Sequence, residues 1–232
     1  MYSFKFNNRA SSEFPAFVVN RPNIPVANED VTTYKIPGRN GTLIVREGTY
    51  PDIPISIPMV YKSTAEEFAE TFRNLKDWLF SKVDNKLSFS DDEGFFYLVK
   101  NVTLSENKRT KRYIGNFTVT FTCEAYQYHV SGSEFLNVEN SLFNPYDQSH
   151  PVYKITGEGV CVLTVNGNRF TVNVGQNVSI DTGRMITFRE DGTIQNTIST
   201  GDYEDLYLNN GNNTISITEG FKLKVKPQWG KL

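Results

Sequence analysis

The stretch IPGRNGTLIVREGTY, residues 36–50, decides how this chain is interpreted. Its Asn40-Gly41 pair lies between two apolar segments, residues 34–36 and 42–45. Asn and Gly both tolerate the positive φ angles of a tight turn, so the pattern predicts a β-hairpin. No catalytic chemistry is visible in this stretch. Its place before an alternating strand and a single helix indicates a part of an assembly.

The segment after the hairpin alternates between two kinds of residue. Ile53, Ile55 and Ile57 alternate with Pro54, Ser56 and Pro58. One face is therefore apolar, whereas the prolines, which lack a backbone donor, predict an edge strand or a strongly interrupted one.

An amphipathic helix is predicted at about Ser63 to Phe80. Thr64 and Glu67 have the spacing of a capping box at its start. Its apolar stripe has helical spacing and consists of Phe68, Phe72, Leu75 and Leu79. We expect this stripe to pack on a sheet.

The remainder of the chain is predicted to be β-structure in two domains. Residues 113–126 alternate clearly between apolar and polar, which is typical of a strand with one solvated face. After residue 150 come many short strands separated by tight-turn pairs such as Asn166-Gly167. We predict a mainly β fold with a first domain at 1–130 that carries the helix, a linker at 131–150, and a β-sandwich or jelly roll at 151–232.

Composition excludes several classes of protein. The 232 residues carry a formal net charge of −2, with a pI of about 5.8, so no overall basic field attracts nucleic acid. Cys123 and Cys161 are too few for a disulfide framework or a zinc site. The sequence has no signal-peptide core and no apolar run of roughly 20 residues. We therefore expect no membrane insertion, and synthesis and assembly in the cytoplasm unless another secretion route exists.

No residue pattern predicts an enzyme, a cofactor or a metal site. His129 and His150 have no motif partners for nucleophilic catalysis or metal binding. The acidic run at 91–93 lacks the further spaced oxygen ligands of a calcium loop and is interpreted as a solvated turn. The basic run at 108–112 has no interleaved aromatic residues and is interpreted as a solvated loop.

Several fragments, taken in order, resemble one protein family. In the first half they are IPGRNGTL with GTYPDIPISIPM, then FRNLKDWL, KLSFSDDEGFFYLVKNV and GNFTVTFTCEAYQY. In the second half they are PVYKITGEGVCVLTVNGNRFTV, SIDTGRMITF and NNGNNTISITEGFKLKVKPQWGKL. Together they resemble the distal tail proteins of siphophages, the phages with long non-contractile tails.

This resemblance implies a structural protein at the tail tip of the virion. Such proteins form a homohexameric ring that joins the tail tube protein to the tail-associated lysin or fibre hub protein, and they anchor receptor-binding proteins. DNA passes through the lumen without specific binding. The first domain would be a ring-forming belt, a β-sandwich with a helix, and the second a galectin-like β-sandwich.

A closed ring of identical subunits needs head-to-tail contacts, and strand edges and projecting hairpins commonly provide them. The hairpin and the proline-containing strand are therefore candidates, although both are also compatible with ordinary loops and edges of a monomer. The candidate ring-interface residues are Gly38, Arg39, Asn40, Gly41, Thr42, Ile53, Ile55 and Ile57.

Two other classes of function stay open at this point. A lectin-like module that recognises cell-wall glycan would need an exposed aromatic platform. The aromatic residues available for one are Phe170, Phe188, Tyr203, Tyr207 and Trp229. A cell-wall hydrolase is disfavoured because no acid/base pair stands out, although paired carboxylates can be far apart in sequence.

Overall fold

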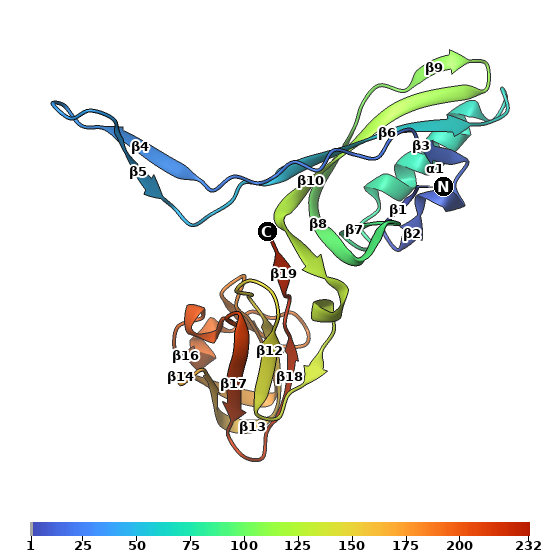
Figure 1. Cartoon of the computed structure of the whole chain (residues 1–232). Coiled ribbons are helices and arrows are strands. Elements are labelled where there is room, and N and C mark those ends of the chain that lie inside the picture. Colours follow the sequence, from blue (N-terminus) through green and yellow to red (C-terminus); the bar gives the residue numbers. More distant parts are fainter. Residues whose placement is uncertain (1) are drawn as a thin grey trace. The chain divides into compact units, whose positions relative to one another are not determined.

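The computed structural model describes residues 2–232 and confirms a mainly β protein with one α-helix (Figure 1). The chain divides into two compact units. The first contains the residues up to Gln127 together with Leu232, and the second contains Tyr128–Lys231. Each unit has its own hydrophobic core.

One sheet and one helix build most of the first unit. The strands of this part are β1 (Phe4–Phe6), β2 (Arg9–Ala10), β3 (Ala16–Val18), β6 (Ile53–Lys62), β7 (Lys86–Phe89), β8 (Asp92–Leu104), β9 (Lys108–Lys111) and β10 (Ile114–His129). Their order in the sheet is β2-β1-β7-β8-β10-β6-β3, and β9 also pairs with β10. A short 3-10 helix, Ser11–Glu13, connects β2 to β3.

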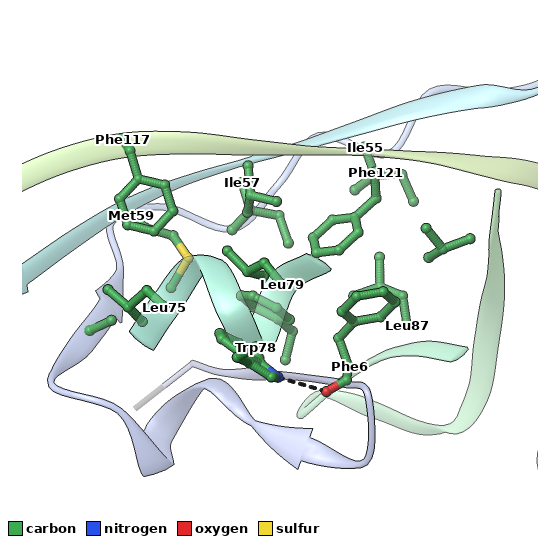
Figure 2. Packing of buried hydrophobic residues seen from close by; sticks show 14 of the residues in the cluster. Phe6, Ile55, Ile57, Met59, Leu75, Trp78, Leu79, Leu87, Phe117 and Phe121 are labelled. Carbon is green, nitrogen blue, oxygen red and sulfur yellow. Dashed lines mark hydrogen bonds between the residues drawn. The ribbon is translucent and has the colours of Figure 1, made fainter. Parts of the chain in front are cut away.

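The core of the first unit lies where α1 (Phe68–Phe80) packs on β6 and β10. Figure 2 shows Leu75 and Leu79 of the helix facing side chains of both strands, whereas Trp78 lies beside Phe6 of β1. Because β6 and β10 pair in register from Ile53↔Cys123 to Lys62↔Ile114, their alternating apolar residues line the same face. The strand residues in this layer are Ile53, Ile55, Ile57, Met59, Phe117, Val119, Phe121 and Cys123.

The prolines of β6 do not interrupt it, contrary to one of our alternatives. The backbone nitrogens and carbonyls of Pro54 and Pro58 point away from β10, toward the other edge of β6. The Pro58 carbonyl shows this direction, because it accepts from the Val19 N–H at 2.9 Å. A missing N–H on that side removes no bond of the β6–β10 ladder. β3 pairs with β6 only at Met59–Tyr61, so the first half of β6 is an edge on this side, as the prolines predict.

The helix begins later than predicted. Thr64 and Glu67 do interact, since the Thr64 Oγ1 accepts from the Glu67 N–H at 3.2 Å, but the α-helix begins at Phe68. Trp78 joins the buried face, and Phe72 is only partly buried. The indole N–H of Trp78 donates to the Phe6 carbonyl at 2.9 Å, which couples the helix to β1 (Figure 2).

The predicted hairpin is present as β4 (Val31–Lys35) and β5 (Thr42–Arg46), which form a separate two-stranded sheet. Its connection is longer than a two-residue Asn-Gly turn. Six residues, 36–41, join the strands, and the positive φ angles are at Gly38 (80°) and Gly41 (84°) rather than at Asn40. The Pro37-Gly38 pair therefore takes part in the turn, which explains the difference.

The second unit is built around one long hairpin, β13 (Val152–Val165) and β14 (Asn168–Asp181). Asn166 and Gly167 form its turn with φ angles of 50° and 92°, as predicted. The other strands are β11 (Leu136–Asn137), β12 (Ser141–Asn144), β15 (Ile186–Phe188), β16 (Ser199–Thr200), β17 (Gly211–Ile217), β18 (Lys222–Lys226) and β19 (Gly230–Lys231). Short 3-10 helices lie at Val130–Ser133, Asn196–Ile198 and Glu204–Leu206.

Besides β14, β13 pairs with two other strands, one along each of its halves. Its first half pairs with β18 and its second half with β17. Gly157 and Gly159 lie between the two halves with φ angles of 156° and 103°, values that side chains disfavour. The stretch 131–150, which we expected to be a linker, contains β11 and β12, and these pair with β18 and β17.

Candidate assembly surface

The β4–β5 hairpin is an almost fully exposed two-stranded sheet of the first unit. Nine of its ten strand residues are exposed, and Thr32 is half-buried. A two-stranded ribbon with both faces in water is marginally stable.

Both faces of the hairpin carry apolar side chains. Residues paired across the ribbon point to the same face, so Tyr34 and Leu43 lie together with the Thr32–Val45 pair. The opposite face carries Ile44 opposite Thr33, flanked by Val31 opposite Arg46. Tyr34, Leu43 and Ile44 are 53%, 45% and 57% exposed. A ribbon that is apolar on both faces is typical of an interaction surface.

Polar contacts at the base of the hairpin extend its order beyond the two strands. The Asp30 N–H donates to the Thr49 carbonyl at 2.8 Å, and the Glu47 N–H donates to the Asp30 carbonyl at 3.0 Å. Arg46 pairs with Glu29 at 2.9 Å. The Thr32 hydroxyl also bonds the Glu47 carboxylate. These contacts keep the strands in register without a core beneath them.

The residues proposed from the sequence fall into two groups. The tip residues Gly38 to Thr42 are all exposed, in the loop and at the start of β5. Ile53, Ile55 and Ile57 are at most 4% exposed and pack beneath α1. Their side chains belong to the core of their own unit and are not available to another subunit. Within the candidate set, the hairpin tip is the accessible part.

Sequence reasoning missed the apolar residues of the hairpin strands. Tyr34, Leu43 and Ile44 are predicted to lie in strands, but the prediction does not place them on the surface. The signal was present in the run Leu43-Ile44-Val45, which is apolar at consecutive positions. Consecutive apolar residues put apolar side chains on both faces of a strand, and they indicate either burial or a partner.

The proposed aromatic platform is not exposed as a unit. Phe170 and Trp229 are buried, and Phe188, Tyr203 and Tyr207 are half-buried. The Tyr203 ring lies 5.2 Å from the Phe170 ring, and its hydroxyl is 2.9 Å from the Thr187 hydroxyl. The Tyr207 ring lies 4.2 Å from the His150 ring, tilted by 31°. These rings pack within the second unit and do not present a flat surface for a sugar.

The cysteine and acidic residues considered in the sequence have surroundings that fit a role in folding. Cys123 is buried, and burial raises its pKa to about 12, so the thiol is protonated at neutral pH and poorly reactive. Asp91 pairs with Arg21 at 3.3 Å on the surface. Among residues 2–232, no group of three or more His, Cys, Asp or Glu side chains is placed to hold a metal ion. Within the same range, no helix has the length and apolar character needed to cross a membrane.

Comparison with known proteins places these features in a family. A model of the phage tail protein RIFT-related domain matches residues 10–123. Curated protein sequences give no match. Among solved structures, a similar fold is that of the Dit protein (gp 19.1) of phage SPP1, described as a paradigm of the hub adsorption apparatus in phages that infect Gram-positive bacteria. The TM-score is 0.66 at 12% identity, over 97% of this chain and 98% of that one.

The family match covers almost all of the first unit, and the structural similarity extends over both units. The family and the similar structure are both structural proteins of phage tails. Residues 10–123 of the first unit therefore match the phage tail protein RIFT-related domain, and the whole chain has a fold similar to that of the SPP1 Dit protein.

Proposed function

We propose that this chain is a non-enzymatic subunit of the distal end of a siphophage tail, where six copies form a closed ring. The ring joins the tail tube to the tail-tip hub and anchors receptor-binding proteins through its outer surface. Its lumen lets DNA pass without specific contacts. The family of the first unit and the fold similarity to SPP1 Dit support this assignment.

The observation that carries the proposal is the uncovered β4–β5 hairpin. A pair of strands with Tyr34 and Leu43 exposed on one face and Ile44 exposed on the other gains stability when another surface covers it. Core residues of the first unit cannot provide that cover, since nine of the ten strand residues are exposed. A second copy of the chain is the partner that a ring requires.

The shape of the contact follows from ring symmetry. If the hairpin of each subunit binds a different surface of the next subunit, the contact is heterologous, and repetition of it closes a ring or produces a filament. A two-fold dimer would instead place the hairpins against each other. The two arrangements predict different masses and different images.

The mass of the purified chain across a concentration series tests the proposal. We expect a species of six subunits, and annular particles in negative-stain images of the same sample. A variant in which residues 36–41 are replaced by a two-residue Asn-Gly turn should keep the far-ultraviolet circular dichroism of the full chain but remain monomeric. A wild-type chain that is strictly monomeric, or only dimeric, would contradict the ring.

A further inference from the structure

A second exposed feature of the first unit lies far along the chain from the hairpin. A groove of about 630 Å³ crosses the solvent-facing side of the sheet where β9, β10 and β6 meet. Its lining includes Pro58, Asn116 and Thr118, with Lys108 and Glu106 at one side. We found no role for this groove in the proposed hairpin contact.

Three lysines gather beside this groove on one face of the sheet. Ile114 of β10 pairs with Lys62 of β6 on one side and with Lys111 of β9 on the other. Lys108 pairs with Asn116, two positions further along the same face. Arg109 points to the opposite face, since its guanidinium lies over the Phe68 ring at 4.1 Å. We call Lys62, Lys108 and Lys111 the lysine face.

Within residues 2–232, none of the three lysines forms an ion pair. All three are exposed, and the Lys62 ammonium lies 5.9 Å from the centre of the Phe17 ring. Glu106 is the one carboxylate in the groove lining. Three lysines beside one glutamate leave a local positive charge that an acidic partner would neutralise.

The complementary charge lies at the opposite end of the same strands. The Ser105 N–H donates to the Thr118 carbonyl near the lysine face, whereas the Gln127 amide donates to Asp92 at 3.0 Å at the far end of β8 and β10. Asp92 begins β8, which has 13 residues and so extends about 40 Å. The start of β8 therefore presents Asp92 and Glu93 at the other end of the sheet, next to Asp91 of the preceding turn, whose carboxylate pairs with Arg21 at 3.3 Å.

Positive charge at one end of the sheet and negative charge at the other favour contacts between copies of the chain. We propose that the lysine face of one subunit receives the acidic turn, residues 90–94, of a second copy of this chain. The two surfaces are on opposite ends of one rigid pair of strands, so a single copy cannot join them. Each subunit would give its turn to one neighbour and receive a turn from the other, which is a head-to-tail contact. The inference rests on the proposed ring and adds a second contact to the hairpin.

Zero-length cross-linking tests the contact directly. A carbodiimide activates a carboxylate, the lysine amine attacks it, and an amide forms while the carbodiimide takes up the elements of water as a urea. We expect cross-linked peptides that join Lys108 or Lys111 to residues 91–93. With an equal mixture of ¹⁴N- and ¹⁵N-labelled chains, half of these peptide pairs should be mixed in isotope, since the two ends of one copy are about 40 Å apart.

Charge reversal gives an independent readout with a matched control. Lys108→Glu with Lys111→Glu should raise the subunit concentration at half assembly roughly tenfold or more. Adding Asp92→Lys and Glu93→Lys to the same chain should restore assembly toward the wild-type value. Lys222→Glu with Lys224→Glu changes the charge by the same amount on exposed positions of β18 in the second unit, and it should leave assembly unchanged.

The outcomes separate the contact from the ring. Wild-type oligomers that lack the predicted cross-links, or lysine reversals that assemble like the wild type, would overturn the contact and leave the ring in place. A reversed pair that is not rescued by the compensating substitutions would also overturn it. A wild-type chain with no oligomer at all would contradict the ring and this contact together.

Discussion

Asn7 illustrates how single polar side chains hold the first unit together. It is 3% exposed and has a φ angle of 51°. Its side-chain amide donates to the Trp78 carbonyl at 2.8 Å, in the last turn of α1, and its side-chain oxygen accepts from the Asp84 N–H at 3.1 Å. The Trp78 carbonyl at the end of the helix thus has a second donor beside the Ser81 N–H, which donates to it at 3.3 Å.

Asn7→Ala should therefore lower the free energy of unfolding by about 1–3 kcal/mol, because the Trp78 carbonyl keeps only its bond from the Ser81 N–H and the half-buried Asp84 N–H loses its partner. Asn8→Ala is the matched control. Asn8 also has a positive φ angle, 60°, but its side chain is exposed, so its substitution carries the backbone cost alone. Urea unfolding of the two variants measures the difference. Equal losses for both would show that the hydrogen bonds contribute little.

Buried acids of the first unit predict a loss of stability in alkali. Burial raises the pKa of Cys123 from 9.0 to about 12, and burial also raises the pKa of Tyr97. Each group is neutral below its unfolded-state pKa, so its contribution to stability is complete there and is lost as pH rises from about 9 toward 12. Urea unfolding at pH 8, 10 and 11 should show the decline. Cys123→Ala should reduce its slope, and an unchanged slope would contradict this assignment.

At the scale of elements, the hairpin should affect assembly without affecting folding. Ile44→Asp places a charge on an exposed apolar face of β5, so we expect intact circular dichroism and a loss of oligomers. Val160→Asp is the control. Val160 is, like Ile44, an exposed β-branched apolar residue of a strand, and it is 64% exposed, but it lies in the second unit. The mass distribution at equal concentrations decides between them. If the Val160 variant dissociates as fully as the Ile44 variant, the hairpin is not the specific contact.

The elements with clear local patterns could be predicted from the sequence. The apolar stripe Leu75 to Leu79 and the Asn166-Gly167 turn each follow from neighbouring residues alone, and both are present as predicted. The role of Ile53, Ile55 and Ile57 could not be predicted correctly, since they were candidates for the ring interface but lie in the core. Alternation shows that one face of a strand is apolar, but only the position of α1 decides whether that face packs in the core or meets another subunit.

The predicted linker shows a similar limit. Residues 131–150 have few consecutive apolar positions, which is typical of a connection between domains. The structure contains two short strands there, β11 and β12, of two and four residues. Strands this short carry too little periodicity to be recognised, and distant partners in β17 and β18 stabilise them.

At the scale of the whole molecule, two separate cores predict local responses to core mutations. Leu163 is fully buried in the core of the second unit. Leu163→Ala should cost about 2–5 kcal/mol through lost burial and the remaining cavity. In hydrogen-exchange mass spectrometry, we expect faster exchange in β13 and β14, with β6 and α1 unchanged. Equal loss of protection in both units would show that they unfold as one.

The central claim is that the hairpin covers a neighbouring subunit in a closed ring. Cryo-electron microscopy of the purified oligomer tests it most directly. We predict a six-subunit ring in which both apolar faces of each β4–β5 hairpin, marked by Leu43 and Ile44, are less exposed than in the single chain, against an adjacent subunit. A ring in which the hairpins extend into solvent, or a two-fold dimer, would contradict the account.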